Sequence, residues 1–158
     1  MPPGLIINNV KDVLAAALGI LDSAQKEVVW VIPASINTLS LIYGGIEKIK
    51  ALIQRGGLSR GVVQISPTNV TEIQMFLDAG EDIRHSDEVH EVFTFVGDKQ
   101  QSISSLNIGV KEFTLDTPVT AFWSESLSYA EYLLTSFENV WSEAIPAEER
   151  IKKLLAQR

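Results

Sequence analysis

The sequence contains no cysteine, which excludes disulfide bonds, thiolate nucleophiles and cysteine-based zinc sites. It also lacks a long hydrophobic run: nowhere do roughly 20 apolar residues follow one another, as a membrane-spanning helix requires. No basic segment followed by an apolar stretch stands at the N-terminus. A secretory signal is therefore not expected, and the predicted location is the cytoplasm.

Basic residues are fewer than acidic ones, 13 against 20, which gives a formal net charge of −7. An acidic domain repels the phosphates of nucleic acids and of anionic membranes, so neither is expected as a direct partner. Histidine is scarce as well. His85 and His90 are five residues apart, which is not the spacing of a helical metal site, and a solvated acidic loop is the favoured interpretation. No metal and no other cofactor is predicted.

The composition is that of one folded domain. Hydrophobic residues make up 46% of the chain and charged residues 21%, and no Gly-, Ser- or Pro-rich linker divides it. Residues 1–158 are therefore predicted to form a single domain, in which 145–158 is a C-terminal helical appendage. Apolar periodicity and turn residues predict the elements within it. We expect helices at 9–24, 39–55, 69–80, 125–144 and after Pro146, and strands at 27–33, 61–66, 81–86, 92–96, 101–106 and 119–123.

Capping residues and apolar stripes refine this expectation. Asn9 with Asp12, and Asn69 with Glu72, are predicted capping pairs at helix N-termini. Two apolar stripes are predicted to face the core: Ile42, Ile46, Ile49 and Ile53, and Leu127, Ala130, Leu134, Phe137, Trp141 and Ala144. The alternation of helices and strands in the first half demands parallel pairing, and the turn at 97–99 adds an antiparallel hairpin. The predicted fold class is α/β, with a mixed, mostly parallel β-sheet flanked by helices.

Polar residues follow the predicted strands, where ligands bind in sheets of this kind. We predict that Ser35, Asn37, Asn69, Arg84 and His85 bind a neutral or anionic small molecule, with the strand end at 123–126 beside them. The same serine and asparagine residues could instead only cap helices, and both interpretations stay open. No nucleophile elbow, P-loop or dinucleotide fingerprint is present, and His85 has no adjacent nucleophile on its face. No catalytic residue is therefore predicted.

Four segments in a fixed order resemble phospholipase D-like domains. They are residues 22–33, 53–65, 92–103 and 137–144, which look like the family's first strand, second strand, motif-bearing hairpin and closing helix. The resemblance spans nearly the whole chain. Within the family, the chain looks most similar to the non-catalytic effector domain of archaeal-type regulators of the TrmB family. The resemblance implies a homodimer in which the hairpin faces its mate.

The family's catalytic signature, H-x-K-x(4)-D, is degenerate in this chain. Alignment on Asp98 puts Glu91 at the histidine position and Phe93 at the lysine position, while His90 is one residue out of register. A carboxylate repels phosphate, and a phenyl ring supplies no charge. The resemblance therefore implies the family's scaffold without its phosphodiesterase chemistry.

The leading hypothesis is a non-catalytic sensor or regulatory domain, in signalling or transcription regulation, that binds a small ligand or a regulatory protein partner. Two alternatives stay open. The first is a degenerate phosphodiesterase that uses His85 or His90 with Asp98. The second is a pure interaction or dimerisation module that buries Leu154 and Leu155 against a partner.

Overall fold

The computed structural model describes residues 4–89, 92–106 and 112–157. His90 and Glu91 lie outside the described residues. The helices are α1 (Val10–Ser23), α2 (Ala34–Ile42), α3 (Gly45–Gln54), α4 (Val70–Asp78), α5 (Leu127–Glu143) and α6 (Ala147–Ala156). The strands are β1 (Gly4–Asn9), β2 (Glu27–Val31), β3 (Leu58–Val63), β4 (Asp82–His85), β5 (Val92–Gly97), β6 (Gln101–Leu106), β7 (Pro118–Ser124) and β8 (Ile145–Pro146). Within the described residues, no helix is both long and apolar enough to cross a membrane.

The strands form one mixed sheet in the order β1-β7-β6-β5-β2-β3-β4-β8. Only the pairs β2–β3 and β3–β4 are parallel, whereas the other five pairings within the described residues are antiparallel. The α/β class and the mixed sheet are thus confirmed, but the prediction of a mostly parallel sheet is wrong. Parallel neighbours need a long crossover, and among strands that neighbour each other in the sheet only β2–β3 and β3–β4 are joined by helices. The strands β5 and β6 are joined by a tight turn, which permits only antiparallel pairing.

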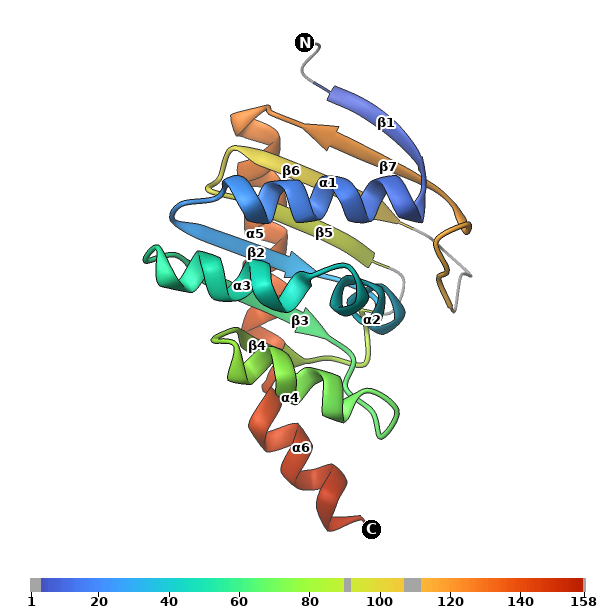
Figure 1. The fold of residues 1–158 in the computed structure, drawn as a ribbon, viewed down its shortest axis with the longest axis vertical. Coiled ribbons are helices and arrows are strands. Elements are labelled where there is room, and N and C mark those ends of the chain that lie inside the picture. Colours follow the sequence, from blue (N-terminus) through green and yellow to red (C-terminus); the bar gives the residue numbers. More distant parts are fainter. Residues whose placement is uncertain (1–3, 90–91, 107–111, 158) are drawn as a thin grey trace.

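Two helical layers cover the sheet (Figure 1). Helices α1 to α4 lie over one face, called here the front face, and α5 crosses the other, the back face. Trp30 marks the front-face core, since it is 2% exposed and lies over Gly61 of the neighbouring strand. A Cβ atom on Gly61 would lie 1.9 Å from the indole ring, so only glycine fits there.

The predicted second helix is in fact two helices. The segment predicted as a polar loop forms α2, and the chain then breaks at Gly44, whose φ of +90° suits glycine. The break interrupts the predicted apolar stripe. Ile42 is therefore 69% exposed rather than buried, whereas Ile46 and Ile49 face the core as predicted.

The capping pair at α1 is confirmed, because the Asn9 side chain accepts a hydrogen bond from the Asp12 N–H at 2.8 Å. The inward face of α5 is largely confirmed too. Ala130, Phe137 and Trp141 are buried on the back face of the sheet. Leu127, the first residue of α5, is 64% exposed, so its predicted inward position is wrong.

Candidate functional site

The carboxyl ends of β2, β3 and β4 meet at one edge of the sheet because these strands are parallel. Strand β7 runs the other way, since it is antiparallel to β6, which is antiparallel to β5, which is antiparallel to β2. Its end at 123–126 therefore lies at the opposite edge, and the prediction that it joins the other strand ends is wrong. The remaining predicted site residues lie at or after the carboxyl ends of β2, β3 and β4.

Ser35 and Asn37 both lie in the first turn of α2 but do different things. The Ser35 hydroxyl accepts a hydrogen bond from the Phe113 N–H at 3.1 Å, which fixes the segment before β7. Asn37 is 2% exposed, and its Nδ2 amide has no hydrogen-bond partner in the described part of the chain. Such a buried, unpaired donor is costly unless something binds it, so Asn37 is a stronger candidate for a ligand contact than Ser35.

Asn69 and His85 both bind the short segment after β3. The Asn69 side chain accepts from the Ser66 N–H and donates to the Gln64 carbonyl, each at 2.9 Å. His85 Nδ1 accepts from the Ile65 N–H at 2.8 Å. These bonds fix the backbone of the loop between β3 and α4.

The predicted capping pair of Asn69 with Glu72 is wrong, because the Asn69 side chain makes no bond to the first turn of α4. The Glu72 carboxylate instead accepts from the Thr38 hydroxyl at 2.6 Å and thereby joins α4 to α2. Both side chains serve loop and helix packing rather than the helix terminus.

His85 is buried and neutral at pH 7. Burial is the main cause that lowers its pKa, and the positive charge of Arg150 lowers it further, while Asp87 acts in the opposite direction. Since Nδ1 accepts a hydrogen bond, the proton sits on Nε2, which lies 3.3 Å from Asp87. The imidazole thus joins the Ile65 backbone to the Asp87 side chain.

Arg84 points away from the other four predicted residues. Neighbouring residues in a strand face opposite sides, so Arg84 faces α5 while His85 faces the α4 side. Its Nη1 donates to the Trp141 carbonyl at 2.8 Å, and its guanidinium carbon lies 4.1 Å from the centre of the Trp141 ring. These contacts anchor the C-terminal end of α5 to β4.

The two described positions of the degenerate motif are both structural. Phe93 is 1% exposed and packs in the front-face core. Asp98 lies in the β5–β6 turn, where its carboxylate accepts hydrogen bonds from the backbone N–H groups of Gln25, Lys26 and Glu27 at 2.8–3.0 Å. Burial alone would raise the pKa of Asp98, but these three bonds lower it below its usual value.

Replacement of Asp98 by alanine is expected to lower the free energy of unfolding by about 2 kcal/mol, because three charge-assisted bonds to the start of β2 are lost. Urea unfolding at pH 7 measures this loss. Since the pKa is lowered on folding, the contribution of Asp98 is present at neutral pH and disappears as pH falls through the folded-state pKa. An equal loss at pH 2 and pH 7 would contradict this assignment.

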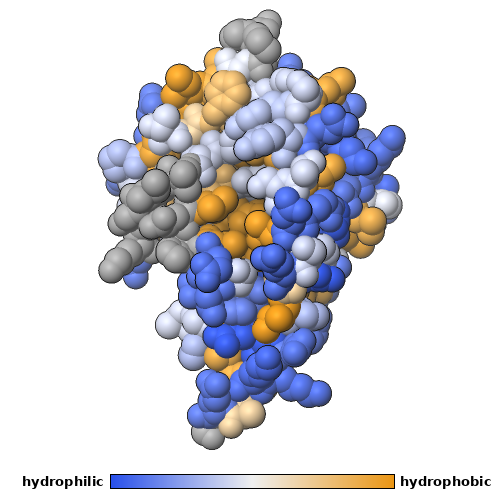
Figure 2. Space-filling model, turned by 180° about the vertical axis from the view of Figure 1, so that it is seen from behind, coloured by the Kyte–Doolittle hydropathy of each residue, from blue (hydrophilic) through white to orange (hydrophobic). Residues whose placement is uncertain are grey.

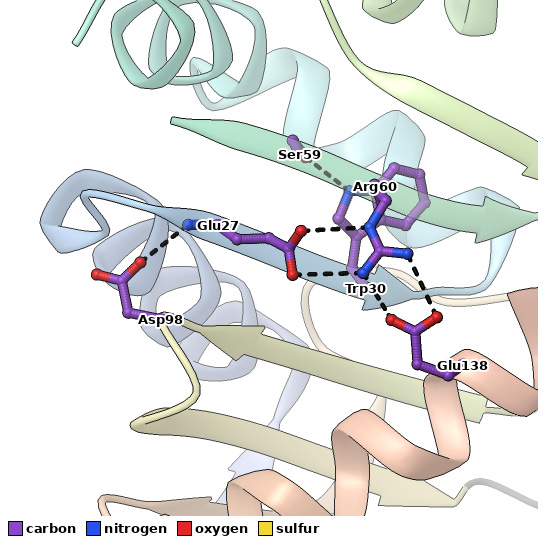
Figure 3. A network of polar contacts seen from close by, with 6 residues as sticks. All are labelled: Glu27, Trp30, Ser59, Arg60, Asp98 and Glu138. Carbon is purple, nitrogen blue, oxygen red and sulfur yellow. Dashed lines mark hydrogen bonds and ion pairs between the residues drawn. The ribbon is translucent and has the colours of Figure 1, made fainter. Parts of the chain in front are cut away.

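Asp98 begins a polar network that crosses the sheet (Figure 3). The carboxylate of Glu27 lies 3.3 Å from Arg60, which also binds Glu138 of α5 at 2.6 Å. The bond to Glu138 is the largest cause that raises the pKa of Arg60. The guanidinium lies over Phe137 and Trp141, at 5.2 and 5.4 Å from the ring centres, so these contacts hold α5 on the back face.

Glu81, which the sequence interpretation missed, is the most unusual polar residue of the front face. It is 7% exposed, and its Oε1 accepts from Trp30 Nε1 at 3.1 Å and from the Ser59 hydroxyl at 2.8 Å. Its Oε2 has no hydrogen-bond partner among the described residues. Burial raises the pKa of Glu81 to about 7, against the lowering effect of these two bonds. The only signal of this residue in the sequence is that its carboxylate comes directly after Gly80, which ends the helix.

An interior cavity of about 40 Å³ connects Glu81 with Asn37. Both residues line it, together with Trp30 and Phe93, the residue at the degenerate lysine position. The remaining lining is apolar and comes from α1, α2, α3, α4 and the sheet: Leu14, Ala17, Leu18, Leu21, Ile32, Ile36, Ser40, Gly45, Ile49, Phe76 and Phe95. We call this space the Glu81 cavity.

Within residues 4–89, 92–106 and 112–157, no three histidine, aspartate or glutamate side chains are grouped so as to hold a metal ion. No protein-family model matches the sequence, and no curated protein matches it. Solved structures do resemble the fold.

TrmBL2, an archaeal chromatin protein, superposes with a TM-score of 0.70 at 14% identity over 92% of this chain, which spans 54% of the TrmBL2 chain. Nuc of Salmonella typhimurium, a phospholipase D family member, gives a TM-score of 0.66 at 11% identity, with 90% of this chain and 97% of Nuc covered. NucT of Helicobacter pylori also gives 0.66, at 7% identity, with 90% of this chain and 98% of NucT covered.

These similarities define the class. The chain has a phospholipase D-like fold. Within that class it resembles the TrmB-type domain, as the similarity to TrmBL2 shows.

Proposed function

We propose that the chain is a non-catalytic phospholipase D-like domain that binds a small ligand as part of a sensor or regulator. One observation carries this proposal: Phe93, at the position of the family's lysine, is 1% exposed and packed in the core. A phenyl ring in that place cannot support a phosphate group. Asp98 does not serve such a group either, because its carboxylate is occupied by three backbone N–H groups. The similarity to TrmBL2 is compatible with a regulatory role.

A turnover assay with bis(p-nitrophenyl) phosphate tests the absence of catalysis. We expect the release of p-nitrophenol by the purified protein to equal that of the buffer, with and without added divalent metal. Turnover that disappears in His90→Ala would overturn the proposal and favour the degenerate phosphodiesterase. His85→Ala tests the other histidine in the same assay, and circular dichroism establishes that the variant is folded.

We further propose a second copy of this chain as a partner, as the family resemblance implies. Ile6 of β1 is paired with Phe122 of β7, whose ring contacts Tyr129 of α5 edge-on at 5.5 Å, and Tyr129 stacks on Tyr132 at 6.2 Å. Three of these four side chains are well exposed: Ile6 at 68%, Phe122 at 40% and Tyr132 at 68%. Apolar side chains also gather near the centre of this back face (Figure 2). Exposed apolar and aromatic side chains grouped in this way favour an interface.

The double variant Phe122→Ser/Tyr132→Ser is therefore expected to weaken self-association at least tenfold, as measured by sedimentation equilibrium. Tyr43→Ser is the matched control, since Tyr43 is 48% exposed at the end of α2 and outside this group of side chains. A wild-type protein that stays monomeric at 100 μM, or a control variant that dissociates equally, would contradict this partner.

A further inference from the structure

The Glu81 cavity contains two buried polar atoms of complementary chemistry. Glu81 Oε2 is an acceptor and Asn37 Nδ2 is a donor, and neither has a partner among the described residues. Their side chains are 7% and 2% exposed, so bulk water does not satisfy them. Each such orphaned atom destabilises the empty cavity, and a bound group that pairs with it removes that cost. A ligand that pairs with both must present a hydrogen-bond donor and an acceptor.

The size of the cavity limits what enters it. One water needs roughly 10–15 Å³ of such space, and the cavity has about 40 Å³, which is room for a few heavy atoms and not for an aromatic ring. Among the lining residues, only Leu18 and Ser40 are partly exposed, which places the mouth between α1 and α2. A small polar head group fits inside, while a larger body must remain outside.

An apolar groove of about 220 Å³ adjoins the cavity and has room for such a body. It shares Leu14 and Leu18 with the cavity and is completed by Lys11, Ala15, Tyr43 and Leu115. The two spaces therefore meet at the same two leucines. Lys11 at the rim disfavours a second cationic group at the outer end of a ligand.

The chemistry of the walls selects the head group. A carboxylate without a positive partner in an apolar cavity favours a cation, and the indole of Trp30 and the rings of Phe93 and Phe95 favour an ammonium further. The amide of Asn37 requires an acceptor beside it, such as a hydroxyl oxygen. We propose that the Glu81 cavity and its outer groove bind a small amphiphilic amine, whose ammonium meets Glu81, whose hydroxyl meets Asn37 and whose apolar body lies against Leu18 and Tyr43.

Calorimetric titration with phenylalaninol tests this site, with phenethylamine and 3-phenylpropionate as probes that lack the hydroxyl and the amine. We expect phenylalaninol to bind most tightly, phenethylamine more weakly and the acid not at all. Glu81→Gln is expected to weaken phenylalaninol binding at least tenfold, whereas Glu131→Gln, at an exposed site on α5, leaves it unchanged. Leu18→Trp, which blocks the mouth from a partly exposed position, is expected to abolish it and tests the site independently of the Glu81 carboxylate.

Three results would overturn the inference: no binding of phenylalaninol to the wild-type protein, binding that survives both Glu81→Gln and Leu18→Trp, or equal binding of 3-phenylpropionate. The inference rests on the proposed ligand-binding function. Its failure is distinguishable from failure of the non-catalytic assignment, because phosphodiester turnover is measured without any amine.

Discussion

Replacement of Phe93 by alanine is expected to lower the free energy of unfolding by about 3–5 kcal/mol, the usual cost of deleting a buried phenyl group. The side chain is 1% exposed and already borders the Glu81 cavity. Its removal would therefore enlarge an existing void rather than let neighbouring side chains collapse into place. Because domains of this size are stable by only about 5–15 kcal/mol, the loss would be a large share of the total.

Urea unfolding of three variants tests whether position 93 belongs to the core. Phe93→Leu keeps most of the volume and is expected to cost less than about 1.5 kcal/mol. Tyr43→Ala, at a ring that is 48% exposed at the end of α2, is the control and should cost far less than Phe93→Ala. Catalytic positions are commonly replaced without loss of stability. A Phe93→Ala variant as stable as the wild type would thus contradict the structural role of this residue.

Replacement of Glu81 by glutamine is expected to stabilise the protein above pH 7 by up to about 3 kcal/mol, with little effect near pH 4. Folding raises the pKa of Glu81 from 4.5 to about 7. The folded state therefore binds the proton more tightly than the unfolded chain does, and the wild type loses stability as pH rises from 4.5 to about 7. Each pKa unit corresponds to about 1.4 kcal/mol, and glutamine removes the titration while it keeps an acceptor for Trp30 and Ser59.

The measurement is the difference in unfolding free energy between Glu81→Gln and the wild type, taken from urea curves between pH 4 and pH 8.5. Burial lowers the pKa of His85, which changes stability with pH in the opposite sense, but this contribution is common to both proteins and cancels in the difference. Glu131→Gln should give a flat difference curve. A flat curve for Glu81→Gln as well would show that the carboxylate is not held in an apolar environment.

Local chemistry accounts for the elements that were predicted correctly. The N-cap of α1 depends on one asparagine and its neighbour three residues on. The β5–β6 hairpin depends on its turn, in which Asp98 and Lys99 adopt positive φ angles. Ser35, Asn37, Asn69 and His85 were correctly placed near the ends of β2, β3 and β4, but their proposed binding of a ligand stays a prediction. The sequence predicts one helix where the structure has α2 and α3. The apolar spacing is continuous along this segment and gives no sign of the break at Gly44.

The sequence by itself determined the α/β class, the hairpin, the absence of a lysine at position 93 and the acidic balance of the domain, because each depends on residue identity or on spacing along the chain. Only the tertiary structure decided the predominance of antiparallel pairing, since pairing is a relation between segments far apart in sequence. It also separated Arg84 from His85 onto opposite faces and joined Asn37 to Glu81 across one cavity. Whether a carboxylate is hydrated or buried depends on what folds over it, and for Glu81 that cover comes from helices and strands throughout the first half of the chain.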